Sequence, residues 1–237
     1  MGIDIKYRAE KIEIMDDFSL GGEELRNTLS QISHINQFLG GNTLTLNGVR
    51  KLLLKADTSK VITIADIGCG NGDMLRMLAN YAEKNNMTFE LIGIDANAFT
   101  IDHARILSTF RNNISYRCVD VFDMDFKTLS FDIILCTLTL HHFSDDKIIN
   151  LMNILVKSSS LGIVINDLQR NKLAYRLFQM ICFVFGFNKM TRDDGLISIL
   201  KGFKKYELES YARKLHLKDY SIKWKWAFRY QWLISHI

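Results

Sequence analysis

Three glycines alternate in the stretch ADIGCGNGD, at positions 68, 70 and 72, directly after the apolar run 61–67. Glycine adopts backbone conformations that other residues avoid, and it lacks the Cβ that would hold a ligand away from the chain. An ordinary turn from a strand to a helix needs only one such residue. The spacing therefore predicts a loop whose backbone lies against a ligand.

The residues around this loop argue against two common nucleotide sites. A phosphate-binding P-loop ends in Gly-Lys followed by Ser or Thr, and no such sequence closes this loop. A GxGxxG dinucleotide loop would place Gly or Ala at position 73, where Asp73 stands. A carboxylate there would repel a pyrophosphate that a helix N-terminus otherwise attracts. We therefore expect a ligand that is cationic or zwitterionic at this point.

Two further acidic residues follow predicted strands. Asp95 ends the run 89–94, and Asp120 follows the run 114–119. A carboxylate at the end of the second strand accepts hydrogen bonds from the vicinal hydroxyls of a ribose in nucleotide-binding folds. The alternative roles are structural, since Asp95 could cap the next helix and Asp120 could lie in a surface turn.

The elements that must position these residues alternate between short apolar runs and amphipathic periods. We expect strands at 61–67, 89–94, 114–119, 131–135 and 161–165, and helices at 72–86, 97–111 and 145–157. This alternation predicts an α/β fold with a parallel sheet covered on both faces, which binds ligands at the carboxyl ends of its strands. Residues 1–60 read as helical, and DYSIKWKWAFRYQWLISHI reads as a β-hairpin.

The motifs together resemble those of class I S-adenosylmethionine-dependent methyltransferases. Asp66 with the three glycines matches the acid-GxGxG motif of that family, and Asp95 and Asp120 match its second and third acids. The resemblance implies a Rossmann-like, doubly wound, mostly parallel seven-stranded sheet with a C-terminal antiparallel hairpin. We divide the chain into an N-terminal helical lid at 1–60 and a core at 61–237, with a helical cap inserted at about 169–202.

The resemblance also implies S-adenosylmethionine as cofactor, S-adenosylhomocysteine as product, and a role for each motif. Asp66 and the glycines would hold the methionyl end, Asp95 the ribose and Asp120 the adenine amino group. From their positions, Phe99 and Phe122 are predicted to flank the adenine. The predicted cofactor-binding residues are Asp66, Gly68, Cys69, Gly70, Gly72, Asp95, Ala96, Asp120, Val121, Phe122 and Thr137.

Candidate acceptor-site residues follow the fourth and fifth strands. In CTLTLHHF, His141 or His142 could act as the general base, because an unperturbed histidine accepts protons near neutral pH. Alternatively, one histidine packs and the other caps a helix. In NDLQR, Asp167 and Arg170 could bind a polar group of the substrate or pair with each other. We predict no metal site.

The composition restricts the class of protein. The chain has 237 residues and a net charge of +4, and its four widely spaced cysteines are typical of reduced thiols in a cytoplasmic protein. The longest apolar stretch, 177–187, falls short of the roughly 20 residues that span a bilayer. We expect no nucleic-acid partner, a monomer or homodimer, and at most weak contact with a membrane surface.

Together these features predict methyl transfer to a small, fairly apolar acceptor. The segments EIMDD, INQFLGG, NDLQR and TRDDG resemble bacterial small-molecule methyltransferases of polyketide and quinone type, which favours a phenolic oxygen. The chain has no proline, so it lacks the Pro-Pro box of enzymes that methylate amino groups of DNA. The alternatives are an RNA or protein methyltransferase and a non-catalytic cofactor-binding subunit. The sequence leaves open the acceptor's identity and O- against C-methylation.

Overall fold

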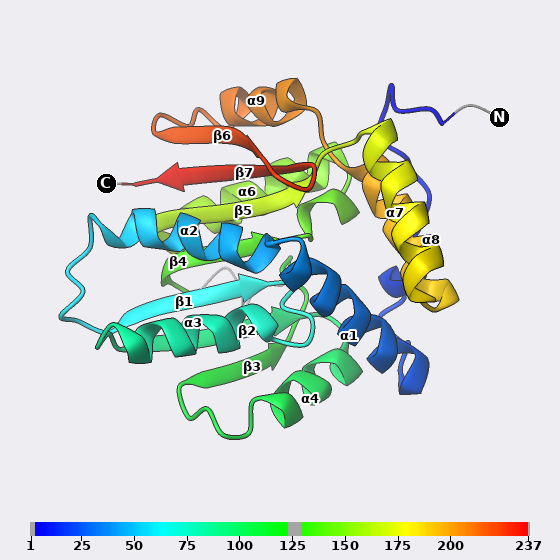
Figure 1. Cartoon of the computed structure of the whole chain (residues 1–237). Coiled ribbons are helices and arrows are strands. Elements are labelled where there is room, and N and C mark those ends of the chain that lie inside the picture. Colours follow the sequence, from blue (N-terminus) through cyan, green and yellow to red (C-terminus); the bar gives the residue numbers. More distant parts are fainter. Residues whose placement is uncertain (1–2, 123–128, 237) are drawn as a thin grey trace.

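The computed structural model describes residues 3–122 and 129–236. Its strands form one seven-stranded sheet in the order β3-β2-β1-β4-β5-β7-β6 (Figure 1). Strands β1 to β5 are parallel, and β7 runs antiparallel to both β5 and β6. The strands are β1 Ile62–Ile67, β2 Phe89–Asp95, β3 Ile114–Cys118, β4 Phe131–Thr137, β5 Ser159–Leu168, β6 Tyr220–Lys225 and β7 Arg229–Ser235. This confirms the predicted Rossmann-like sheet and its C-terminal hairpin.

Helices cover both faces of the sheet because successive side chains of each strand point to opposite sides. In β1, Ile64 packs in a core with α2, α3 and α4, whereas Ala65 packs in a second core with α6 and α9. The α-helices are α1 Gly22–Phe38, α2 Gly41–Leu53, α3 Asp73–Lys84, α4 Ala98–Leu107, α6 Asp145–Ser158, α7 Lys172–Phe185, α8 Lys189–Lys201 and α9 Lys205–Lys214. Two short 3-10 helices, η1 (Ile14–Asp16) and η2 (Leu140–His142), complete the described elements.

The order of the strands creates a switch point between β1 and β4. From β1 the chain adds β2 and β3 on one side, and it then returns to add β4 and β5 on the other. Crossover connections diverge at such a point, which leaves a crevice at the carboxyl ends of the strands. Helices α1, α7 and α8 lie across these ends (Figure 1).

The segments outside the central repeat have different roles. Helix α2, within the predicted lid 1–60, packs directly on the sheet, where a Cβ at Gly48 would lie 2.4 Å from Val164. Helix α1 contacts α8 instead, and α7 with α8 make up the insertion predicted at 169–202. The division into lid and core stays a prediction, but α2 is part of the layer that covers the sheet.

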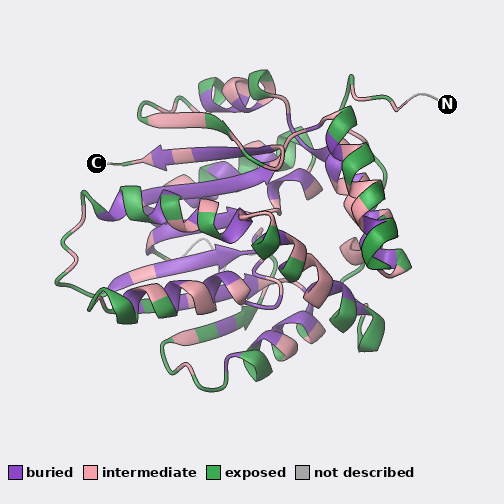
Figure 2. Cartoon of the chain, in the orientation of Figure 1, coloured by how far each residue is buried: buried purple, intermediate pink, exposed green. Residues whose placement is uncertain are grey.

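Burial separates the sheet from the cap. Strands β1, β4 and β5 are largely buried, whereas much of α7 is exposed (Figure 2). Apolar side chains on α7 that are exposed to solvent include Leu173 and Phe183. Across the ranges 3–122 and 129–236, no helix combines the length and apolar character that crossing a bilayer requires.

Candidate active site

The glycine loop between β1 and α3 has the backbone conformation that its sequence predicts. Gly68, Gly70 and Gly72 have φ values of 67°, 52° and 76°, which side-chain-bearing residues rarely adopt. A Cβ at Gly68 would lie 2.3 Å from Thr139 Oγ1, whereas at Gly70 it would meet nothing nearer than Leu29 at 3.9 Å. Gly70 therefore leaves its backbone open to a neighbouring cavity.

That cavity lies at the carboxyl ends of the strands and has a volume of about 940 Å³. This is near the upper end of the range for small-molecule sites, about 300–1,000 Å³, and leaves room for two small ligands. Ten of the eleven predicted cofactor-binding residues line it, and Gly72 does not. The ten are Asp66, Gly68, Cys69, Gly70, Asp95, Ala96, Asp120, Val121, Phe122 and Thr137.

Two acidic residues flank the loop and differ in their hydrogen bonding. Asp66 is 2% exposed, and its Oδ1 has no hydrogen-bond partner among the residues that the structure describes. Burial, together with the charges of Asp73 and Asp95, raises the pKa of Asp66 to about 8. Asp95 accepts hydrogen bonds from the backbone N–H groups of Asn97 (3.0 Å) and Gly70 (3.2 Å), and burial raises its pKa despite these bonds. The loop thus offers a protonatable carboxyl and an oriented one.

His141 forms a buried dyad with Asp167. His141 Nδ1 lies 2.7 Å from Asp167 Oδ1, and the His141 backbone N–H donates to Oδ2 at 3.2 Å. Burial alone would raise the pKa of Asp167, but the charge of His141 and the hydrogen bonds outweigh it and lower that pKa. When the His141 ring is neutral, an ionised Asp167 holds its single proton on Nδ1. In that form His141 Nε2, which has no hydrogen-bond partner within residues 3–122 and 129–236, is the proton acceptor of a side chain that lines the cavity.

His142 has a different environment. Its Nδ1 lies 2.6 Å from Asp16 Oδ1, and its ring stacks on His141 with 4.4 Å between centroids. Burial alone would lower the pKa of His142, but the hydrogen bond with Asp16 and the charge of Glu13 outweigh it and raise the pKa. His142 is thus favoured as a cation, and His141 is the better placed of the two to accept a proton.

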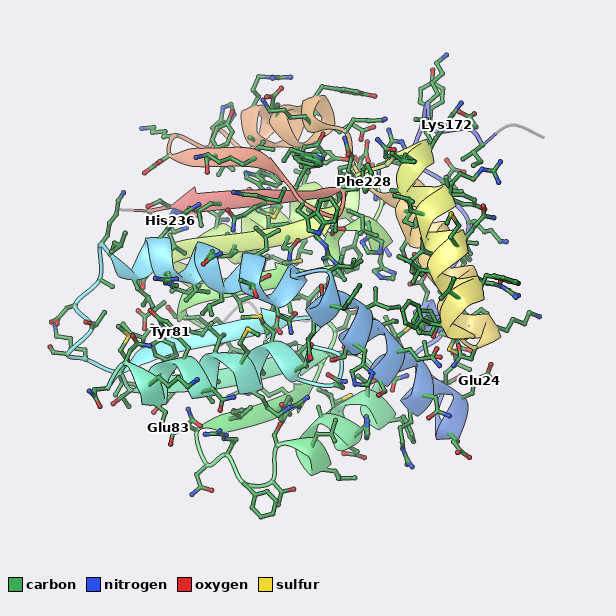
Figure 3. The ribbon with its side chains drawn as sticks, viewed as in Figure 1. Glu24, Tyr81, Glu83, Lys172, Phe228 and His236 are labelled. Atoms are coloured by element: carbon green, nitrogen blue, oxygen red, sulfur yellow. The ribbon has the colours of Figure 1, made fainter. Side chains whose placement is uncertain are left out.

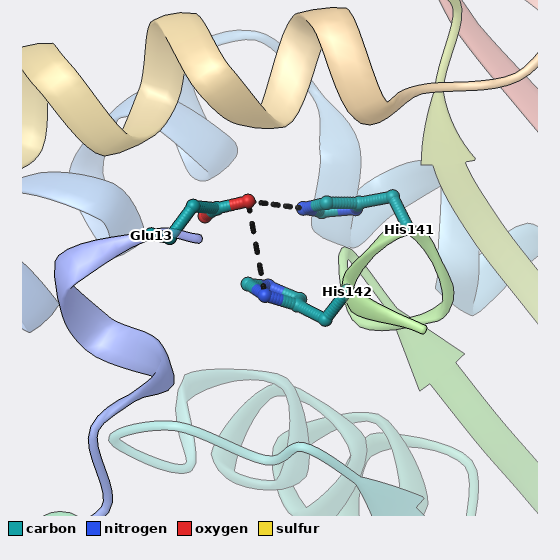
Figure 4. Close-up of side chains that lie close together, drawn as sticks. All are labelled: Glu13, His141 and His142. Atoms are coloured by element: carbon teal, nitrogen blue, oxygen red, sulfur yellow. Dashed lines mark ion pairs between the residues drawn. The ribbon is translucent and has the colours of Figure 1, made fainter. Parts of the chain in front are cut away.

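Glu13 brings a second buried carboxylate to the histidines, as Figure 4 shows. Its Oε1 lies 3.9 Å from His141 Nε2 and 3.8 Å from His142 Nδ1, close enough for the three residues to hold a metal ion. However, the Lys201 ammonium lies 3.2 Å from the same Glu13 oxygen and 3.1 Å from Asp16. A metal ion would have to compete with this buried cation.

The structure corrects the roles predicted for Asp167 and Arg170. Neither residue lines the cavity, and they do not pair with each other. Asp167 orients His141, as described above. Arg170 is fully buried, pairs with Glu207 through Nη2 at 2.6 Å and Nη1 at 3.1 Å, and donates from Nε to the carbonyl of Ile5. Its donors are thus used within the protein.

Phe99, one of the two aromatic residues predicted to flank an adenine, does not line the cavity. Phe99 lies against Gly21 and packs beside Leu25 and Leu29 at the start of α1, outside the cavity wall. The N-terminal segment covers Phe99, and nothing in the local sequence around it signals that contact. Phe122 does line the cavity and packs edge-on against Phe143, with 5.4 Å between ring centroids.

Sequence reasoning missed the polar residues that α1 and α2 bring to the loop. Asp73 Oδ2 accepts hydrogen bonds from Ser33 Oγ at 2.9 Å and Asn42 Nδ2 at 2.7 Å. Asn36, Asn42 and Arg229 also line the cavity. Asp73 is more than 30 residues from each of its two partners in sequence, so spacing could not have revealed these contacts.

The opposite wall of the cavity is apolar. Helices α7 and α8 contribute most of it, and Phe228 lies at this edge of the sheet, toward the start of α7 at Lys172 (Figure 3). The apolar residues that line this wall are Ala174, Leu177, Phe178, Met180, Ile181, Val184, Phe185 and Ile199. The cavity therefore combines a polar end at the glycine loop with an apolar end under the cap.

Comparison with known proteins finds a methyltransferase domain and methyltransferases of similar fold. Residues 64–158 match the model of a family described as a methyltransferase domain. The structure of the plantazolicin methyltransferase BpumL, in complex with a pentazolic desmethyl analogue and S-adenosylhomocysteine, superposes with a TM-score of 0.67 at 18% identity, covering 88% of this chain and 90% of that one. Magnesium protoporphyrin IX methyltransferase from Synechocystis PCC 6803, with bound S-adenosylmethionine, superposes with a TM-score of 0.56 at 10% identity, covering 92% and 87%.

Matches to curated sequences are shorter. Over 84 residues the chain is 37% identical to tRNA U34 carboxymethyltransferase of Sulfurovum sp. (strain NBC37-1) and 30% identical to that of Campylobacter curvus (strain 525.92). These stretches cover 35% of this chain and 26% of each relative. Residues 64–158 therefore match a methyltransferase domain, and the chain has the fold of solved methyltransferases, in agreement with the family that its motifs resemble.

Proposed function

We propose that this protein binds S-adenosylmethionine at the glycine loop and transfers its methyl group to a phenolic oxygen of a small, fairly apolar acceptor. The observation that carries the proposal is the His141–Asp167 dyad, whose free Nε2 belongs to a side chain lining the cavity. The apolar wall beneath α7 supports an acceptor with a largely apolar body, such as a polyketide- or quinone-like ring.

The residues present suit the cofactor. An ammonium group beside Asp66 would provide the positive charge that this buried carboxyl lacks, and Asp95 offers acceptors for ribose hydroxyls. Asp120 would accept from the adenine amino group, and Val121 and Phe122 would line the adenine pocket. The bound sulfonium supplies an activated methyl group that needs only an aligned nucleophile.

His141 would take the phenolic proton as the oxygen–carbon bond forms and the carbon–sulfur bond breaks. The proton moves to Nε2, and the resulting imidazolium lies between two carboxylates. Asp167 contacts Nδ1 at 2.7 Å, and Glu13 Oε1 lies 3.9 Å from Nε2. A general base in position typically contributes 10²–10⁴-fold in rate, and alignment of the acceptor adds to this.

The test is methyl transfer to a panel of phenols by the native protein and by His141→Asn. Asparagine keeps a polar side chain but cannot accept a proton at neutral pH. We expect kcat to fall about 10²- to 10⁴-fold, with the affinity for S-adenosylhomocysteine unchanged. His34→Asn is the matched control, because His34 lies exposed on α1. Equal kcat values for native protein and His141→Asn would remove His141 from the reaction.

The match to tRNA-modifying relatives supports a second candidate, an RNA acceptor. Lys223, Trp224, Lys225 and Trp226 alternate on the C-terminal hairpin, and the two tryptophans are 52% and 74% exposed. Aromatic faces beside positive charges suit stacked bases and a phosphate backbone. Tight binding of transfer RNA that weakens steeply from 50 to 200 mM salt would favour this candidate over a phenol. Cofactor binding with no turnover of either acceptor would favour a non-catalytic subunit.

A further inference from the structure

Arg229 is a buried cation without a partner in the cavity. It begins β7, pairs in register with Leu168 of β5 and is 3% exposed. Its Nε and Nη1 make no hydrogen bond within the described part of the chain, and no carboxylate of that part lies within 4.0 Å of it. Burial lowers the pKa of Arg229 to about 10, although the charge of Asp167 opposes this shift, so the side chain is still cationic at neutral pH. Asp167 acts on this charge but accepts no hydrogen bond from it. Buried N–H donors without an acceptor are costly, which suggests that a ligand anion accepts from them.

The first turn of α2 lies beside this guanidinium. A Cβ at Gly41 would lie 1.8 Å from Asn36 Oδ1 and 3.0 Å from Arg229 Cζ, so glycine at the start of α2 leaves room for both side chains. No side chain caps this end of α2, because the N-cap residue is Gly40. The first N–H groups of a helix lack partners within the helix, and they carry partial positive charge. Two sources of positive potential therefore lie side by side, and Arg229 and Asn42 of this first turn both line the cavity.

The charges of the cavity are separated along its polar end. Asp66, Asp73 and Asp95 act on one another at the glycine loop, whereas Arg229 lies beside Gly41 and Asn36. Asn42 joins the two sides, because its Nδ2 donates to Asp73 and its backbone belongs to the first turn of α2. A zwitterion fits this arrangement, with its ammonium toward the acids and its carboxylate toward the arginine.

We propose that Arg229 and the first turn of α2 form a carboxylate-binding site. The carboxylate can come from the methionyl end of the cofactor or from the acceptor. The proposal rests on the cofactor binding proposed above and is independent of the phenolic acceptor. Arg229 would fix the carboxylate through two N–H groups, as arginine commonly does with carboxylates.

The first arm of the test is calorimetric titration with two ligands. S-adenosylhomocysteine carries the carboxylate, and S-adenosyl-3-thiopropylamine keeps the ammonium but lacks the carboxylate. If the cofactor is the source, Arg229→Gln weakens binding of S-adenosylhomocysteine roughly 10- to 100-fold and leaves the decarboxylated ligand within about threefold of its native affinity. Arg229→Lys should recover part of the loss, and Arg50→Gln, an exposed arginine on α2, is the matched control.

The second arm tests the acceptor as the source, with benzoate as the probe and S-adenosylhomocysteine saturating. If the acceptor brings the carboxylate, benzoate stabilises the native complex against heat but not the Arg229→Gln complex, while the two proteins bind S-adenosylhomocysteine equally.

The proposal is wrong if Arg229→Gln weakens both adenosyl ligands alike, or if neither ligand affinity nor the benzoate effect changes. Failure of the native protein to bind S-adenosylhomocysteine at all would instead overturn the cofactor site.

Discussion

At the scale of single residues, burial decides what each polar group of the cavity can do. Asp66 and Asp167 are equally hidden from solvent, yet burial raises the pKa of Asp66 whereas His141 holds that of Asp167 low. The difference arises because Asp167 has a hydrogen-bonded partner and Asp66 has two acidic neighbours. The site therefore combines Asp66, a carboxyl group that a cationic ligand would ionise, with Asp167, a carboxylate that orients His141.

The raised pKa of Asp66 predicts proton release on cofactor binding. With a pKa of about 8 the carboxyl is mostly protonated at pH 7, and an ammonium ligand favours the ionised form. Binding of S-adenosylhomocysteine at pH 7 should release about one proton, and its affinity should rise roughly tenfold from pH 6 to pH 7.

Calorimetry in buffers of different ionisation enthalpy measures this release. Asp66→Asn should bind more weakly, with an enthalpy that no longer depends on the buffer. A native binding enthalpy that is the same in every buffer would contradict the prediction.

At the scale of elements, one ion pair joins three parts of the chain that are far apart in sequence. Arg170 follows β5, Glu207 lies in the first turn of α9, and the carbonyl of Ile5 belongs to the N-terminal segment. Because the Arg170 side chain is fully buried, its positive charge needs the carboxylate of Glu207 to compensate it. This pair, rather than substrate binding, explains why an arginine stands at the end of β5.

Removing the charge of Glu207 should therefore destabilise the fold. For Glu207→Gln we expect a loss of about 3 kcal/mol in the free energy of unfolding, because a buried cation loses its partner. The matched control is Glu209→Gln on the same helix, which breaks an exposed pair with Lys205 and should cost less than about 1 kcal/mol. Urea denaturation of both variants measures the difference, and equal losses would show that Arg170 does not need Glu207.

At the scale of the whole molecule, distant segments close one cavity. The N-terminal segment, η2 and α8 meet through the Asp16–His142 and Lys201–Glu13 contacts. Helix α1 and the cap formed by α7 and α8 cover the ends of the strands (Figure 1). The segments that cover the ends of the strands are thus held by ion pairs as well as by apolar packing.

This closure predicts a dependence of stability on pH. The folded-state pKa of His142 is raised above the ordinary value of 6.5, so its contribution is fully present below pH 6.5 and is lost as pH rises through the folded value. The free energy of unfolding should therefore differ more between native protein and His142→Asn at pH 6 than at pH 9. Urea denaturation at the two pH values measures these free energies. A difference between the two proteins that does not change with pH would exclude a stabilising role for charged His142.

The sequence by itself determined the parts of this protein that depend on neighbouring residues. The alternation of apolar runs and amphipathic periods predicted the parallel sheet and the hairpin, since periodicity reflects which face of an element is buried. The glycine loop and the acids that end β2 and follow β3 predicted one wall of the cavity, because parallel strands bring their carboxyl ends to one edge. For that reason ten of the predicted cofactor-binding residues line the cavity.

Only the tertiary structure decided which polar side chains face the cavity. Asp167 and Arg170 stand at the end of β5 as the sequence suggests, but they are engaged by His141 and Glu207. Glu13 and Arg229 come from opposite ends of the chain and carry no local signal of their place. Contacts between segments so far apart arise from the packing of whole helices and strands, which periodicity and motif spacing do not encode.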